Sequence, residues 1–197
     1  MWQVIKVNSN AVVAICTLLI AIYTVILARI SRRQVRDARV HNRAYVGVAL
    51  AGIDVWRSGD QLVGDVLIQN AGNLPAQRLQ WVVHIDVDTD RDRYDFPIDY
   101  PRIKGSHFVP AKGEMLVGTP PIALEKVLQV RDNEPACYLY VWGLVRYFDG
   151  FTEYRETFFC HRYDYKLSVY NPKGPAGEHY RLEARLGRHH KEGNRAS

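Results

Sequence analysis

Residues 79–88 read LQWVVHIDVD, and the pattern of this stretch decides the fold class. Every second side chain is apolar, and the positions between them are mostly polar. The apolar positions are Leu79, Trp81, Val83, Ile85 and Val87. Successive side chains of a strand point to opposite faces of its sheet, so this alternation predicts a β-strand with one buried face.

The segments before this strand predict a hairpin. Residues 45–56 and 62–69 are rich in apolar and β-branched side chains, and an Arg-Ser-Gly-Asp turn at 57–60 separates them. An Asn-Ala-Gly-Asn-Leu-Pro run at 70–75 then ends the second strand.

After residue 88 the pattern is less regular. Shorter strands are expected at 106–109 and 114–118, and the apolar spacing at 122–131 suits one or two helical turns. About seven short strands between residues 44 and 164 predict an all-β domain, an antiparallel immunoglobulin-like β-sandwich, with a closed barrel as the alternative.

The last two strands, 138–148 and 151–162, flank an Asp-Gly pair that is typical of a two-residue hairpin turn. With such a turn the numbers of opposed residues add to about 299, which places Trp142 opposite Thr157. In this register Cys137 and Cys160 lie diagonally, a poor geometry for a disulfide, so we expect two free thiols.

A run of 22 residues without a charged side chain, 7–28, precedes the β domain. A helix of this length, rising about 1.5 Å per residue, crosses a hydrocarbon core of about 30 Å. A buried core helix would carry more polar side chains, and a cleavable signal peptide would have a shorter apolar run and a small-x-small site before Arg29. We therefore expect one uncleaved transmembrane helix, spanning about residues 8–30.

Residues 29–43, which we call the arginine collar, follow this run. They carry one acidic residue and six arginines: Arg29, Arg32, Arg33, Arg36, Arg39 and Arg43. The positive-inside rule predicts that the collar and the following domain are cytoplasmic and that the N-terminus lies outside. The collar contains no Gly or Pro, so it should continue the helix, and we expect it to contact anionic lipid headgroups rather than nucleic acid.

Charge divides the chain into three parts. The whole chain has a net charge of +5, but residues 44–164 carry 12 Lys/Arg and 17 Asp/Glu, so the body is acidic. The basic excess belongs to the N-terminal part, 1–43, and to the C-terminal part, 165–197. We expect the C-terminal part to be a disordered basic tail, because it begins with a Pro- and Gly-rich linker and is polar beyond it.

Residues that could perform chemistry are few. Asp86, Asp88, Asp90 and Asp92 have the early spacing of a calcium loop, but Arg91 occupies the required glycine position. We expect this cluster to be the solvated end of a strand rather than a metal site. No phosphate-binding, dinucleotide or nucleophile-elbow motif is present, so we expect no cofactor and no catalytic residue.

We expect the histidines and cysteines to have no catalytic or specific metal-binding role. His84, His107 and His161 are expected at the surface or at strand edges rather than as general bases. The His189-His190 pair is expected to capture metal ions only adventitiously. The buried-strand thiols are expected to be inert, which agrees with a reducing compartment.

Aromatic side chains are concentrated on the last hairpin. Those that face the core pack between the sheets. We expect those that face away from it, among them Tyr138, Tyr140 and Trp142, to offer a face for a protein partner.

Several segments resemble a group of bacterial single-pass membrane proteins with no established activity. The matching segments are 31–34 (SRRQ), 43–46 (RAYV), 70–76 (NAGNLPA), 140–151 (YVWGLVRYFDGF) and 157–160 (TFFC). The resemblance covers about residues 8–162. It implies a bacterial inner-membrane location and a β-sandwich, and it supplies no catalytic residues.

These observations favour a non-catalytic protein-interaction module that is tethered to the inner membrane and binds an unknown protein partner. One alternative is a small-ligand or enzymatic site built from the loop at 86–107. Another is a lipid-surface sensor that uses the collar and the basic tail.

Overall fold

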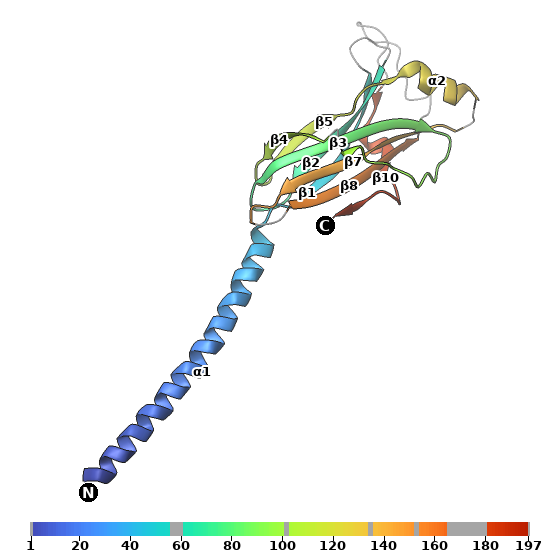
Figure 1. The fold of residues 1–197 in the computed structure, drawn as a ribbon. Coiled ribbons are helices and arrows are strands. Elements are labelled where there is room, and N and C mark those ends of the chain that lie inside the picture. Colours follow the sequence, from blue (N-terminus) through green and yellow to red (C-terminus); the bar gives the residue numbers. More distant parts are fainter. Residues whose placement is uncertain are drawn as a thin grey trace. The chain divides into compact units, whose positions relative to one another are not determined.

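The computed structural model describes residues 2–55, 61–100, 103–133, 136–151, 154–164 and 181–196. The chain forms two compact units, residues 1–42 and 43–197. The first is the helix α1 (Trp2–Asn42), and the second consists mainly of strands (Figure 1). The chain is therefore mostly β with one long N-terminal helix, rather than all-β.

Helix α1 is continuous over 41 residues, so the arginine collar prolongs the apolar helix as predicted. Its part from residue 11 to residue 42 contains an 18-residue window with a mean hydropathy of 2.7, none of it buried within the protein. The helix is thus long and apolar enough to cross a membrane. The hydroxyl groups of Thr17 and Thr24 donate hydrogen bonds to carbonyl groups four residues earlier, so neither presents an unsatisfied donor to an apolar environment.

The second unit contains two antiparallel sheets. The first sheet has the order β5 (Glu114–Gly118), β2 (Gln61–Asn70), β1 (Val46–Val55) and β9 (Arg181–Leu182), and β6 (Ile122–Ala123) also pairs with β2. The second sheet has the order β10 (Gly187–His189), β8 (Tyr154–Asp164), β7 (Tyr138–Phe148), β3 (Ala76–Asp88) and β4 (Lys104–Val109), and β11 (Arg195–Ala196) also pairs with β8. In the described residues both strand paths are open, so these strands form two sheets rather than a closed barrel.

Most of the strands expected from the sequence are confirmed. Strands β1 and β2 form the first hairpin, although its turn at 57–60 lies outside the described residues. Strand β3 has the expected alternation, since Leu79, Val83 and Val87 are buried between the sheets. The helical spacing at 122–131 corresponds to α2 (Leu124–Asn133), whose Val127 is fully buried.

The register of the last hairpin differs from the prediction. Trp142 faces Cys160 rather than Thr157, and the innermost pair is Phe148 with Tyr154, so the connection has five residues instead of two. Asp149 is withdrawn from the ladder because its backbone carbonyl accepts from the Ala44 amide at 3.1 Å. The shift is an odd number of residues, and in the observed register Cys160 lies beside Tyr140 and Trp142 on the outer face of the sheet.

The C-terminal part is also corrected. Residues 181–196, expected in a disordered tail, form β9 on the first sheet and β10 and β11 on β8, while residues 165–180 lie outside the described part. Leu182 is buried in the core, and Gly187 packs so tightly that an added Cβ would lie 2.1 Å from the Leu50 side chain. These apolar contacts explain why the segment folds back.

Side chains of the second sheet close the edge of β1. The Tyr147 hydroxyl accepts from the Val46 amide at 3.3 Å, and the Thr157 hydroxyl donates to the Val46 carbonyl at 2.9 Å. Farther along, the Tyr163 hydroxyl accepts from the Gly52 amide at 3.2 Å. Backbone groups that an edge strand would otherwise leave unpaired are satisfied in this way.

Candidate binding groove

A connection between β3 and β4 lies across the outer face of the second sheet, and we call its residues 89–100 the strap (Figure 1). Side chains from the sheet bind its backbone carbonyl groups. The Tyr140 hydroxyl donates to the Asp90 carbonyl at 2.6 Å, and the Trp142 indole donates to the Pro97 carbonyl at 3.0 Å. Arg162 binds the Arg91 carbonyl at 2.9 Å, so the irregular backbone is held at several points.

The strap covers the aromatic face that the sequence suggested for a partner. Tyr140, Trp142 and Cys160 form a second small core on the outside of the sheet, and Phe96 and Ile98 of the strap pack against it. Tyr140 and Trp142 are therefore buried by the protein itself, which corrects the expectation that they are exposed. Tyr138 lies beside them and is partly exposed.

Arg93, in the middle of the strap, binds the strap to the sheet. Its guanidinium pairs with Asp86 at 3.2 Å and with Asp88 at 3.5 Å, and it lies 5.2 Å from the centre of the Trp142 ring. Burial raises the pKa of Asp86, but hydrogen bonds from Lys126 and Arg93 outweigh it and hold that pKa below its usual value. In the described part of the chain, no three His, Cys, Asp or Glu side chains are grouped to hold a metal ion.

Residues 181–196, which we call the C-terminal segment, also bind the strap. His190 is buried, and its Nε2 lies 2.7 Å from the Arg93 carbonyl oxygen. Lys191 pairs with Asp92 at 3.2 Å. Asn194 takes the place of a neighbouring strand at Cys160, because its Oδ1 accepts from the Cys160 amide at 3.0 Å.

The other histidines lie apart from the aspartates. His161 is fully buried, not at the surface as expected, and burial together with His189 lowers its pKa to about 4. His84 stacks on Trp142, while His107 packs against Trp81, with ring centres 4.4 Å apart. His107 and the aspartates therefore do not converge on one site.

The two cysteines of the β domain are buried free thiols, as predicted. Burial raises the pKa of Cys137 to about 11 and that of Cys160 to about 12. Both are therefore protonated and unreactive near neutral pH.

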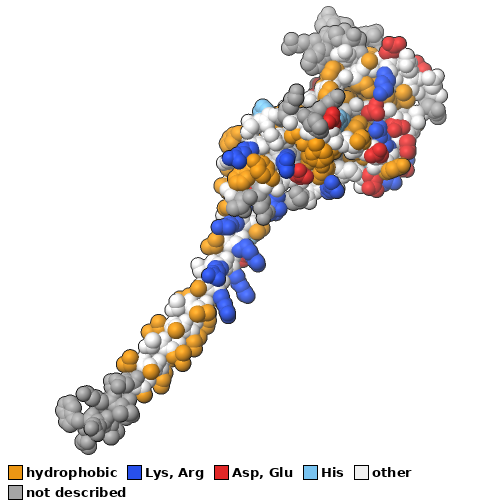
Figure 2. Space-filling model, viewed as in Figure 1, with side chains coloured by type: hydrophobic (Ala, Val, Ile, Leu, Met, Phe, Trp, Pro, Cys, Tyr) orange, Lys and Arg blue, Asp and Glu red, His pale blue; other side chains and the backbone are white. Residues whose placement is uncertain are grey.

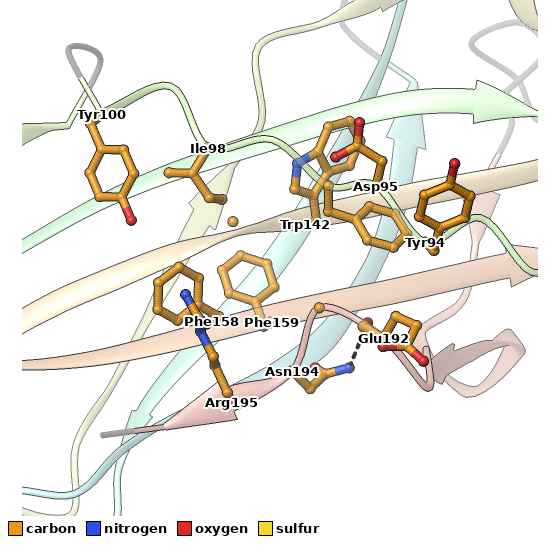
Figure 3. Close-up of a pocket in the computed structure, with 13 residues that line it drawn as sticks. Tyr94, Asp95, Ile98, Tyr100, Trp142, Phe158, Phe159, Glu192, Asn194 and Arg195 are labelled. Atoms are coloured by element: carbon orange, nitrogen blue, oxygen red, sulfur yellow. Dashed lines mark hydrogen bonds between the residues drawn. The ribbon is translucent and has the colours of Figure 1, made fainter.

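A groove of about 520 Å³ remains between the strap and the C-terminal segment (Figure 3). Its strap side consists of Tyr94, Asp95, Phe96, Ile98 and Tyr100, its floor of Trp142, Gly143, Phe158 and Phe159, and its other side of Glu192, Gly193, Asn194 and Arg195. Tyr94 and Tyr100 at the rim are 83% and 53% exposed. The groove thus has an apolar floor and a polar rim, a combination typical of binding sites.

The arginine collar lies on the other unit. Arg29, Arg32, Arg33, Arg36 and Arg39 are exposed on α1, next to a stretch covered by hydrophobic side chains (Figure 2). Apart from the adjacent pair Arg32 and Arg33, they follow one another at intervals of three residues, which keeps them along one side of the helix. Arg43 belongs to the β unit, where its guanidinium lies 4.5 Å from the centre of the Tyr45 ring.

We found no matching protein-family model, and no significant match among curated proteins or solved structures. The groove itself was not foreseen from the sequence. The one local signal for it is the density of aromatic residues in the strap, at Tyr94, Phe96 and Tyr100, which is unusual for a solvated loop.

Proposed function

We propose that the chain is a non-catalytic protein-interaction module, tethered to the bacterial inner membrane by α1 and facing the cytoplasm. The apolar helix and the arginines that follow it support this location and orientation, since positive charge beside a span is retained on the cytoplasmic side. The collar arginines would also contact anionic lipid headgroups.

We further propose that the β unit has an immunoglobulin-like architecture. The order β1-β2-β5 in one sheet and β8-β7-β3-β4 in the other corresponds to A-B-E and G-F-C-C′ of such sandwiches. Domains of this architecture serve many unrelated functions, so the fold by itself selects none of them.

The groove carries the functional proposal. It combines an apolar floor with two exposed tyrosines at the rim, and amphipathic aromatic side chains are the residues that most often anchor protein partners. An enzymatic site in the loop 86–107 has less support, because Asp86 and Asp88 pair with Arg93 and His107 packs against Trp81 elsewhere.

Site-specific photo-crosslinking in membranes of the native host tests the proposal. A photoreactive phenylalanine analogue replaces Tyr94 or Tyr100, and the same analogue replaces Leu116, which is 63% exposed on β5 away from the groove. We expect a discrete protein adduct from each tyrosine position and none from position 116. Absence of an adduct at both tyrosine positions, or the same adduct at position 116, would overturn the assignment of the groove.

Reporter fusions after Ser197 test the orientation independently. Activity of a reporter that works only in the cytoplasm is expected. Activity of a reporter that requires the periplasm would place the β unit on the opposite side of the membrane.

A further inference from the structure

Three charged side chains around the groove differ from their neighbours. Close by, Arg93, Arg162 and Lys191 all form ion pairs with aspartates. Among the described residues, no ion pair involves the remaining three charged groups of the groove: Asp95, Glu192 and Arg195. All three are exposed, so each is available to a ligand.

These three charges are separated along the groove. The carboxylates of Asp95 and Glu192 lie toward the Tyr94 end, and Arg195 lies toward the Tyr100 end (Figure 3). The Arg195 guanidinium stacks on Phe158, 4.1 Å from the ring centre, which fixes its direction without neutralising it. Between the two ends lie the partly exposed apolar side chains of Ile98 and Phe158.

We propose that the groove binds an extended peptide segment of the partner that carries an acidic and a basic residue on opposite sides of a large apolar residue. This inference rests on the proposed function and adds the chemistry of the partner. The acidic residue pairs with Arg195, the apolar side chain covers Ile98 and Phe158, and the basic residue lies between Asp95 and Glu192. Complementary charges of this kind fix the register and direction of a bound chain.

Two features favour a peptide over a small zwitterion. Sites for small molecules commonly enclose most of the ligand surface, whereas this groove is bordered by the exposed Tyr94 and Tyr100 and is partly open to solvent. Glu192 and Arg195 are three residues apart, about 10 Å at most for an extended chain. A bound extended segment would therefore carry its opposite charges at most about three positions apart.

Selection from a random peptide library displayed on phage tests the inference, with the full chain held in phospholipid nanodiscs. Three proteins are compared: the wild type, Arg195→Glu, and the control Arg188→Glu. Arg188 is exposed on β10 in the same C-terminal segment, but it does not line the groove.

We expect the wild type and Arg188→Glu to enrich peptides with acidic, large apolar and basic residues in the proposed spacing. Charge reversal at Arg195 should weaken the binding of these peptides about fivefold, because it removes one exposed ion pair and places a like charge beside the acidic residue of the peptide. It should instead enrich peptides with a basic residue at the acidic position. Such a gain of new specificity cannot result from misfolding.

Enrichment of peptides that share an apolar residue but no charge order would overturn the inference and leave the protein-interaction function standing. Failure to enrich any peptide on the wild type, or an Arg195→Glu consensus equal to that of the wild type, would also overturn it. The photo-crosslinking result decides separately whether the groove binds a partner at all.

Discussion

Replacing Arg93 with Gln should make the strap open more often without unfolding the β unit. The substitution removes two ion pairs, with Asp86 and Asp88, and the contact with the Trp142 ring. Partly exposed ion pairs contribute up to about 1 kcal/mol each, and a cation–π contact contributes about 0.5–1 kcal/mol. Allowing for non-additivity, the loss is about 2 kcal/mol, which corresponds to a roughly thirtyfold rise in strap opening.

Hydrogen exchange measured by mass spectrometry on the full chain in detergent micelles checks this value. Backbone amides of residues 89–100 should exchange about thirtyfold faster in Arg93→Gln, while those of β7 should keep their wild-type protection. Arg131→Gln is the matched control, because the ion pair that the described residues show for Arg131 is with the adjacent Asp132 at the end of α2, and its loss should leave both segments unchanged.

Two results would refute the reasoning. Unchanged exchange in the strap would mean that Tyr140 and Trp142 hold it without Arg93. Equal acceleration in the strap and in β7 would mean that the strap does not open independently of the sheet.

Three further predictions concern buried polar groups. Asn70→Ala should lower the free energy of unfolding in urea by about 3 kcal/mol, because it leaves several buried backbone partners of the Asn70 side chain unsatisfied. The control Gln69→Ala, at the exposed neighbouring position, should cost less than about 0.5 kcal/mol, and equal losses in the two variants would contradict the prediction. In a Cys16→Ser variant, which removes the exposed third cysteine, Cys137 and Cys160 should react with a thiol reagent at pH 8 only after unfolding, and fast labelling of the folded chain would contradict their burial. Burial lowers the pKa of His161 from 6.5 to about 4, so between these pH values the unfolded chain binds more protons than the folded chain. The free energy of unfolding in urea should therefore fall by about 2–3 kcal/mol from pH 6.5 to pH 4. His161→Phe should reduce this pH dependence, and an unchanged pH profile in that variant would contradict the argument.

Features that follow from a regular apolar pattern within a single strand or helix were predictable from the sequence. Burial on one side of β3 follows from the alternation that begins at Leu79, and the length of α1 follows from an apolar run followed by a segment without Gly or Pro. Each of these features depends on side chains that are close in sequence and share one environment.

Features that depend on distant partners were not predictable. The Asp149-Gly150 pair is typical of a two-residue turn, but the contact between Asp149 and Ala44, more than 100 residues away in sequence, requires a longer connection. The free-energy difference between two-residue and longer turns is smaller than the free energy that the hydrogen bonds and packing of this contact provide. Tertiary structure therefore decides the register of the hairpin.

One of the segments noted in the sequence, the run at 70–76, has a clear structural role. Asn70, in the run at 70–76, is buried, and its side chain binds the backbone of Tyr45, Gly72, Leu74 and Pro110. It thereby joins the start of β1, the end of β2 and the turn after β4. An asparagine suits this position because its amide both accepts and donates hydrogen bonds.

Charge explains why the strap and the C-terminal segment fold together. The acidic excess of residues 44–164 is concentrated at the end of β3 and in the strap, where Asp86, Asp88 and Asp92 follow one another. The C-terminal segment brings Lys191 to Asp92 and His190 to the strap backbone, so its basic residues do not act as an independent tail. The basic composition of this segment is therefore part of what holds it in place.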